Sequence, residues 1–231
     1  MACHQLLQPA RALRAAPRNS SAGRRETFTV TAALTDPPSN RRVFVYLPLS
    51  PAASGGVELS RFVAEACLAL PALHCSSSWR EKGHHVSLSP GASRDLSPDD
   101  DAAALADTLR HELKYAPPPR VLPLCTPAVA INEDRTRTFL TMEASGVAVA
   151  QIAGTIAAVN RAFKMHDLPS VRVSPLKPHV SVAWAWGDVT TDLGYAVKRA
   201  QRNSELDCWQ MEVGEVKLSV GAQEFTVWSA Q

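Results

Sequence analysis

Two copies of the tripeptide His-Val-Ser are the residues in this sequence best suited to chemistry. One copy spans His85–Ser87 and the other spans His179–Ser181. Imidazole has an ordinary pKa of about 6.5, so a histidine can accept or donate a proton near neutral pH. A serine hydroxyl can donate a hydrogen bond to a charged phosphate oxygen. Two such motifs together predict phosphoryl transfer by a general base and a general acid, without a metal.

Each copy begins a segment that alternates like a β-strand. Residues two apart in a strand share a face. One face of each strand is therefore predicted to present an imidazole and a hydroxyl together: His85, Ser87 and Ser89 in the first, and His179, Ser181, Ala183 and Ala185 in the second. The opposite faces are predicted to pack in the core: Val86 and Leu88 in the first, and Val180, Val182, Trp184 and Trp186 in the second.

The other histidines are predicted to be structural. A third His-x-Ser match, His74–Ser76, leads into a predicted loop, and His84, His111 and His166 match no motif. A zinc site would need a third ligand at suitable spacing, and the chain has neither an HExxH motif nor a CxxC pair. We therefore expect no metal and no cofactor.

The elements that position these motifs follow from periodicity and turn residues. In chain order we expect a strand over 43–48, a helix over 57–70, a strand over 84–89, a helix from Asp99 to Lys114, a hairpin of 121–131 and 136–143, a helix over 146–165, a strand over 179–186, a helix over 190–204, and strands over 209–220 and 223–229. This order predicts an α+β fold of antiparallel sheets flanked by helices.

Composition excludes several classes of protein. The chain has 231 residues, of which 45% are hydrophobic and 20% charged, unlike disordered, collagenous or coiled-coil proteins. No apolar run approaches the roughly 20 residues of a membrane span, so we expect no membrane segment. Five scattered cysteines without a CxxC pair are expected to be reduced thiols.

The charge is concentrated at the start of the chain. Residues 1–42 hold seven arginines against Glu26 and Asp36, a net charge of +5, whereas the remaining residues carry −3. We expect residues 1–42 to be a basic extension and residues 43–231 to be a single domain. An arginine- and serine-rich, acid-poor start is typical of an organelle transit peptide, but it also suits a nuclear-localisation or RNA-tethering tail or a disordered extension.

Longer segments resemble a known family. In order, VFVYLPL (43–49), HVSLS (85–89), NEDRTRTFLTMEAS (132–145) and KPHVSVAWAWGD (177–188) resemble the U6 spliceosomal RNA phosphodiesterase family of the 2H phosphoesterase superfamily. VKLSVGAQEFTVW (216–228) resembles the last hairpin of that family. The similarity covers roughly residues 43–229. It implies a two-lobed fold with a central cleft and one His-x-Ser motif on each side.

The resemblance also implies an activity. Members are 3′-to-5′ exoribonucleases that trim the uridine-rich 3′ end of U6 RNA, leaving a 2′,3′-cyclic phosphate that some members open. By position, this implies acid–base roles for His85 and His179, phosphate binding by Ser87 and Ser181, and contacts to the terminal nucleotide by Lys177 and Pro178. We expect a monomer in the nucleus, or in an organelle if the arginine-rich start is a transit peptide.

Some positions leave alternatives open. The family has a base-stacking aromatic residue six positions before the second motif histidine, where this chain has Val173, so base preference or affinity is expected to differ. Phe163 and Trp79 are either substitutes for it or core residues. Arg135 and Arg137 either contact RNA phosphates or form a solvated hairpin end.

Two other functions are compatible with these motifs. The first is another 2H enzyme that hydrolyses 2′,3′-cyclic phosphates or 2′,5′-linked oligonucleotides. The second is a non-catalytic module that binds RNA 3′ ends, although two intact His-x-Ser motifs favour catalysis.

Overall fold

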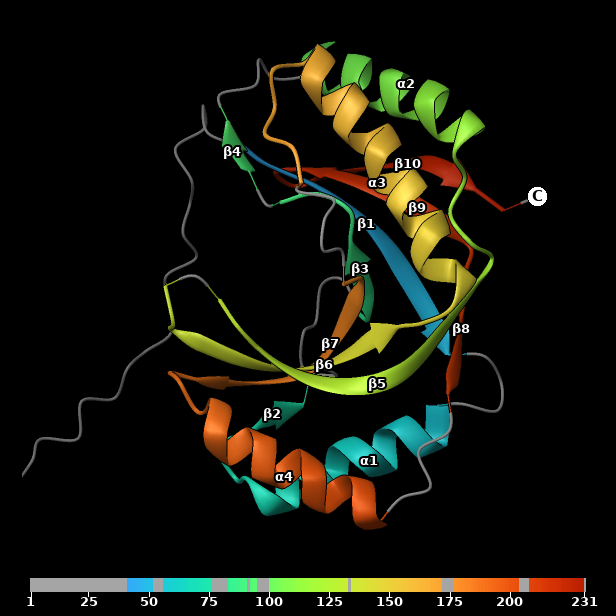
Figure 1. Cartoon of the computed structure of the whole chain (residues 1–231). Helices are drawn as coiled ribbons and strands as arrows, with labels where there is room; N and C mark the ends of the chain where they lie inside the picture. The colour runs from blue at the N-terminus through green and yellow to red at the C-terminus, as the bar shows by residue number, and fades with distance from the viewer. Residues whose placement is uncertain are drawn as a thin grey trace, which may run out of the picture. The chain divides into compact units, whose positions relative to one another are not determined.

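A ten-stranded antiparallel sheet carries both His-Val-Ser segments (Figure 1). The computed structural model describes residues 41–51, 56–75, 83–90, 92–94, 100–132, 134–171, 177–203 and 208–230. The strands are β1 (Arg41–Pro51), β2 (His74–Cys75), β3 (His85–Ser87), β4 (Ala92–Arg94), β5 (Val121–Ile131), β6 (Arg137–Ala144), β7 (His179–Trp186), β8 (Trp209–Val213), β9 (Glu215–Val220) and β10 (Gln223–Ser229). The helices are α1 (Gly56–Ala69), α2 (Asp100–Tyr115), α3 (Val147–Met165) and α4 (Thr190–Asn203).

The strands form one sheet where the sequence led us to expect separate ones. Their order is β10-β9-β1-β3-β7-β6-β5-β8, and β8 also pairs with β1. The length of β1 explains this continuity, because its first half pairs with β4 and β9 while its last residues pair with β8. The expected antiparallel pairing is confirmed, and the cleft between two lobes stays a prediction.

Two helix pairs cover the sheet. Figure 1 shows α2 beside α3 near β9 and β10, and α1 beside α4 near β5. Helical spacing explains the inner face of α4, where Leu193, Ala196, Val197 and Ala200 are buried. On the strands facing the helices, Val86 and Val180 are among the buried side chains. Hydrophobic burial therefore fixes which face of each central strand remains accessible.

The predicted helices and the β5–β6 hairpin are confirmed, while three strand assignments change. The short strands β2 and β4 were not predicted, because two or three residues carry no detectable periodicity. The segment predicted as a loop after His74 begins as β2, which pairs with β7. The expected strand over 209–220 is divided at Gly214 into β8 and β9.

The expected faces of β7 are wrong beyond Ser181. Leu140 of β6 pairs with Ala183, and Thr141 pairs with Ser181, so Val182 is an extra residue in β7. Such a bulge reverses the alternation that follows it. Val182, Ala183 and Ala185 are buried, whereas Trp184 is half-buried and Trp186 is exposed. The two tryptophans therefore lie on the face of His179 and Ser181, where small alanines were expected.

Ser89 also departs from the expected face. Its side chain is buried, and its hydroxyl oxygen accepts a 2.8 Å hydrogen bond from the backbone N–H of Val45. The strand β3 ends at Ser87, so the alternation does not continue to Ser89. This serine holds the end of β3 against β1.

A disulfide contradicts the prediction of reduced thiols at two positions. Cys125 of β5 is bonded to Cys208, which immediately precedes β8. Leu124 and Trp209 are register partners in the β5–β8 pairing, so antiparallel geometry places the two cysteines opposite each other. The two cysteines are 83 residues apart in the sequence, so local sequence patterns could not predict that they are neighbours.

Several predictions lie outside the described residues. They concern residues 1–40, Trp79, Asp99 and Val173. Within the described ranges, no helix combines the length and apolar character needed to span a bilayer.

Candidate active site

The pairing of β3 with β7 brings the two His-Val-Ser segments side by side. Val86 and Val180 are direct partners in this antiparallel pairing. Since antiparallel strands run in opposite directions, the histidine of each segment lies across from the serine of the other. Both valines are buried, so all four motif side chains share the opposite face. We call these four side chains the His-Ser square: His85, Ser87, His179 and Ser181.

The dimensions of the square suit a phosphate group. Directly opposed residues of antiparallel strands have Cα atoms about 4.5–5.5 Å apart, and diagonal neighbours lie roughly 7–8 Å apart. The two histidines occupy one diagonal and the two serines the other. Imidazoles on a diagonal can approach a phosphate from two sides, with the hydroxyls beside it. The roles of the individual side chains stay predictions.

Both histidines of the square are oriented by the same backbone contact. The Nδ1 atom of His85 lies 3.1 Å from the carbonyl oxygen of Gly83. The Nδ1 atom of His179 lies 2.9 Å from the carbonyl oxygen of Lys177. A carbonyl oxygen only accepts hydrogen bonds, so Nδ1 is the donor in each contact. In the neutral ring the lone pair is then on Nε2, which makes Nε2 the basic nitrogen of each imidazole.

Two aromatic rings pack against His85. The centroids of Phe44 and Tyr46 lie 5.7 Å and 5.5 Å from the imidazole centroid, both in edge-on arrangements. The hydroxyl of Tyr46 donates a 2.6 Å hydrogen bond to Glu224. Burial, followed by this hydrogen bond, raises the pKa of Tyr46 well above its ordinary range. The phenol therefore stays protonated and holds the wall beside His85 in place.

A carboxylate lies beside the second histidine. Glu143 of β6 is the register partner of His179. One of its carboxylate oxygens is 3.5 Å from the ammonium group of Lys177. Lys177 is exposed, so it can exchange this partner for a phosphate. Sequence reasoning missed Glu143 because only the β6–β7 register places it next to His179.

Pro178 is buried, and its backbone carbonyl makes a hydrogen bond at the start of β7. Its side chain is buried, and its carbonyl oxygen accepts a 2.8 Å hydrogen bond from the backbone N–H of Ala144. This bond fastens the start of β7 to the end of β6. The contact of Pro178 with a nucleotide stays a prediction.

The two hairpin arginines have different surroundings. Arg135 forms an ion pair with Asp188 and has a positive φ of 56° in the turn before β6. Hydrogen bonds from Thr190, followed by Arg135, hold the pKa of Asp188 below its ordinary value. Arg137 instead lies over the rings of Trp184 and Trp186. Arg135 is largely exposed, whereas Arg137 is half-buried against the two tryptophans, and contact of either arginine with RNA stays a prediction.

The remaining candidates lie apart from the square. Phe163 of α3 is fully buried and belongs to the core. His166 lies 3.0 Å from the hydroxyl oxygen of Thr108, and His111 packs edge-on against Tyr115. His74 stacks on Trp184, with ring centroids 4.7 Å apart. These contacts agree with the structural roles expected for His111 and His166.

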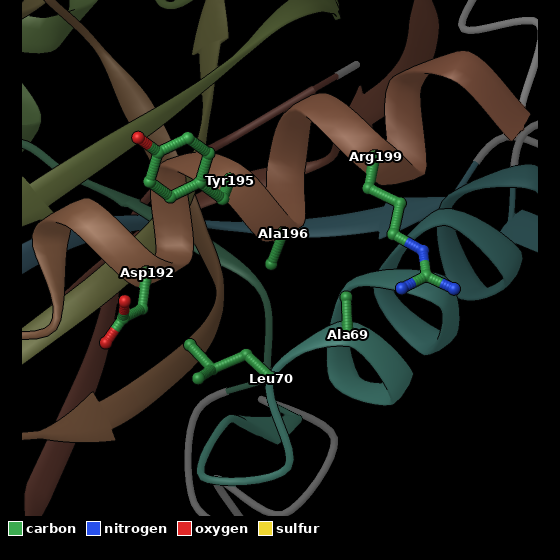
Figure 2. A pocket seen from close by; sticks show the side chains of 6 residues that line it. All are labelled: Ala69, Leu70, Asp192, Tyr195, Ala196 and Arg199. Carbon is green, nitrogen blue, oxygen red and sulfur yellow. The ribbon is translucent and has the colours of Figure 1, made fainter. Parts of the chain in front are cut away.

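A surface pocket of about 300 Å³ lies elsewhere, between α1 and α4 (Figure 2). Figure 2 shows the six residues that line it: Ala69, Leu70, Asp192, Tyr195, Ala196 and Arg199. None belongs to the His-Ser square or its neighbours. The chemistry-bearing residues therefore mark the candidate site, and this pocket does not.

Comparison with known proteins identifies the family. The HVSL family, described as an uncharacterised conserved protein, matches residues 39–228. This chain belongs to the HVSL family. The family match includes both motifs of the His-Ser square, and it confirms the resemblance found in the sequence. Comparison with curated protein sequences gives no match.

Solved structures are similar to this HVSL protein. Usb1 from Kluyveromyces marxianus is 17% identical, with a TM-score of 0.55, and the alignment covers 83% of this chain and 99% of Usb1. The same protein with uridine monophosphate is 16% identical, with a TM-score of 0.59 and the same coverage. E. coli LigT in its apo form is 13% identical, with a TM-score of 0.47, and the alignment covers 83% of this chain and 98% of LigT. The likeness to Usb1 establishes the α+β fold.

Proposed function

We propose that this protein is a 3′-to-5′ RNA exonuclease that trims uridine-rich 3′ ends, with U6 RNA as its substrate, and leaves a 2′,3′-cyclic phosphate. The observation that carries the proposal is the Val86–Val180 pairing, which assembles two imidazoles and two hydroxyls on one face of the sheet. The uridine monophosphate in the Usb1 structure supports a uridine nucleotide as ligand of this fold.

The proposed reaction is a transesterification at the last phosphodiester. One histidine of the square takes the proton of the penultimate nucleotide's 2′-hydroxyl through Nε2. The 2′-oxygen forms a bond to phosphorus while the bond from phosphorus to the 5′-oxygen of the terminal nucleoside breaks. The other histidine, protonated at Nε2, gives its proton to that leaving oxygen. The products of the first cut are a free nucleoside and an RNA that is one nucleotide shorter and ends in a 2′,3′-cyclic phosphate, and no water is consumed. Each later cut by the same reaction releases the terminal nucleotide as its 2′,3′-cyclic phosphate.

The serines act on the charge of the transferred group. Ser87 and Ser181 donate hydrogen bonds to the non-bridging phosphate oxygens, where negative charge is held in the transition state. Lys177 adds a positive charge beside the second histidine when it leaves Glu143 for the phosphate. The reaction needs no metal, because both proton transfers and the charge stabilisation come from these side chains.

A uridine-tailed RNA oligonucleotide in the presence of EDTA tests the proposal. Wild type is expected to shorten it stepwise to a cyclic or 3′-phosphate end, read by mass spectrometry. His85→Ala and His179→Ala are each expected to lower the rate by about 10²–10⁴-fold. His111→Ala is the matched control, because His111 is an exposed histidine on α2, outside the square.

Three results contradict the proposal. Inactivation by EDTA would assign the chemistry to a metal. Opening of an added cyclic phosphate without any shortening would identify another kind of 2H enzyme. Tight RNA binding without cleavage, unchanged in His85→Ala, would identify a binding module.

A further inference from the structure

Two tryptophans and an arginine contact one another at the end of β7 that is distant from His179. The rings of Trp184 and Trp186 meet edge-on with centroids 5.0 Å apart. The guanidinium carbon of Arg137 lies 5.4 Å from the Trp184 centroid and 4.6 Å from the Trp186 centroid. Both distances fall within the range of cation–π attraction. We call Arg137, Trp184 and Trp186 the Trp-Arg surface.

The Trp-Arg surface shares a face of the sheet with the His-Ser square. The extra residue Val182 turns both tryptophans to the side of His179. On β6, Arg137 and Glu143 are three alternations apart and therefore point to the same side. Arg137 is the register partner of Trp186, just as Glu143 is the register partner of His179. Strand β7 thus carries His179 and Ser181 of the square at one end and both tryptophans of the Trp-Arg surface at the other.

The exposed member of this group is Trp186, at 58%, and it lies against a half-buried tryptophan and a half-buried arginine. The three side chains therefore form a contiguous surface of two indole rings and a guanidinium group. Within the part of the chain that the structure describes, no carboxylate forms an ion pair with Arg137. Indole and guanidinium planes are the groups on which unpaired nucleobases stack, irrespective of base identity. The positive charge of Arg137 also suits a polyanionic strand.

The distance from the square suits a strand of RNA. Because Val182 is an extra residue, the distance is counted on β6, where three to five residues separate the partner of Val180 from the partners of Trp184 and Trp186. This corresponds to roughly 10–17 Å along the sheet. RNA with a stacked spacing of about 3.4 Å per nucleotide covers this distance in roughly three to five nucleotides, and an extended strand needs fewer. On the other side of the square, β9 is less suited to bind RNA, because the positive charge of Lys217 is paired there with Glu215 and Glu224.

We propose that the Trp-Arg surface is a stacking subsite for the bases of single-stranded RNA upstream of the scissile phosphate. The proposal rests on the RNA substrate of the proposed function and extends it to the body of the strand. Trp186 is the outer ring on which a base stacks, and Arg137 and Trp184 support it. His74 stacks on Trp184 and fixes the inner ring.

Binding of 2′-O-methyl oligouridine tests the subsite separately from catalysis. This probe lacks the attacking hydroxyl and is not cut by the proposed reaction. We compare the dissociation constants of a two-nucleotide probe, which cannot reach the subsite, and an eight-nucleotide probe, by fluorescence anisotropy. The affinity advantage of the longer probe is the ratio of the dissociation constant of the two-nucleotide probe to that of the eight-nucleotide probe. Trp186→Ala is expected to reduce this ratio by roughly 5- to 100-fold.

Further variants separate stacking from other effects. Trp186→Phe is expected to restore most of the advantage, because it keeps an aromatic face. Arg137→Gln is expected to reduce it, and thermal unfolding checks that each variant is folded. Tyr195→Ala, which removes an exposed aromatic side chain from α4, is the matched control and is expected to keep the wild-type advantage.

An abasic probe identifies the group that is bound. When the bases roughly three to five nucleotides from the 3′ end are removed, wild type is expected to bind the long probe as weakly as Trp186→Ala does. An unchanged length advantage in Trp186→Ala would overturn the subsite and leave the surface to a protein partner. An equal loss for both probes would overturn it too, because that pattern denotes general damage.

The two proposals can fail independently. If unmodified RNA is not cut but Trp186→Ala still loses affinity for the long probe alone, the proposed exonuclease activity is wrong and the proposed RNA-binding subsite is supported. If RNA is cut and the affinity advantage of the long probe is the same in wild type and Trp186→Ala, the proposed subsite is wrong and the proposed exonuclease activity is supported.

Discussion

Val86 and Val180 are direct partners across two antiparallel strands, and both side chains are buried. This single pairing determines where the four polar side chains beside it point. The valines anchor the strands in the core, and the histidines and serines therefore emerge on the accessible side. Hydrophobic packing thus assembles a polar site that neither motif could form alone.

The serines of the square are expected to act mainly on kcat. Ser87→Ala and Ser181→Ala each remove a hydrogen bond to a non-bridging phosphate oxygen, and loss of one such donor typically costs about 10²–10³-fold in kcat. Steady-state cleavage of a uridine-tailed RNA measures this. Ser229→Ala, an exposed serine at the end of β10, is the control. An effect confined to KM would show that the hydroxyls bind substrate without stabilising the transition state.

The pH dependence of kcat/KM is expected to be bell-shaped. One histidine must be neutral and the other protonated, so kcat/KM falls at both lower and higher pH than the optimum. The acidic and alkaline limbs report two apparent pKa values that belong to the pair of histidines and not to either one alone. Tyr46 does not contribute the alkaline limb, because burial and its hydrogen bond to Glu224 raise its pKa. Tyr46→Phe is expected to cost about 1 kcal/mol of stability and to leave that limb in place.

Two observations would contradict this scheme. A rate that rises continuously to pH 10 would exclude the pair of histidines. An alkaline limb that moves in Tyr46→Phe would assign that limb to the phenol.

Local patterns in the sequence were sufficient for much of the fold. The alternation around His85 and His179 predicted that each histidine shares a face with its serine, because strand geometry depends on neighbouring residues only. The apolar periodicity of α3 and α4 predicted both helices for the same reason. The order of elements then predicted an antiparallel α+β fold.

Features that depend on distant residues could not be predicted in this way. The bulge at Val182 follows from the register of β7 against β6, and it reversed the expected positions of Trp184 and Trp186. Glu143 reaches His179 through that same register. The Cys125–Cys208 bond joins residues that only the β5–β8 pairing makes neighbours.

His84 is expected to make the fold less stable in acid. Burial lowers its pKa from the ordinary value of 6.5. Between the folded and unfolded pKa values, the unfolded chain binds a proton that the folded chain does not, so the free energy of unfolding falls as pH drops below about 6.5. His84→Gln removes this proton linkage. Urea unfolding at pH 7.5 and pH 5.5 should therefore show a smaller loss of stability in His84→Gln than in wild type.

His111→Gln is the control for that measurement, because His111 is exposed. It is expected to lose as much stability as wild type between the two pH values. A loss in His84→Gln equal to that of wild type would show that other groups cause the acid sensitivity.

Reduction of the Cys125–Cys208 bond is expected to destabilise the protein. Closing a loop of 83 residues restricts the unfolded chain, and the chain-entropy treatment gives about 4.5 kcal/mol for that length. Wild type treated with dithiothreitol should therefore unfold at lower urea concentration than untreated protein. Cys125→Ser should unfold like the reduced protein and should not respond to dithiothreitol, whereas Cys67→Ser, at a cysteine outside this bond, should respond like wild type. Two results together would show that the bond does not form in solution. Wild type would be equally stable with and without dithiothreitol, and both thiols of untreated protein would react with a thiol reagent after unfolding.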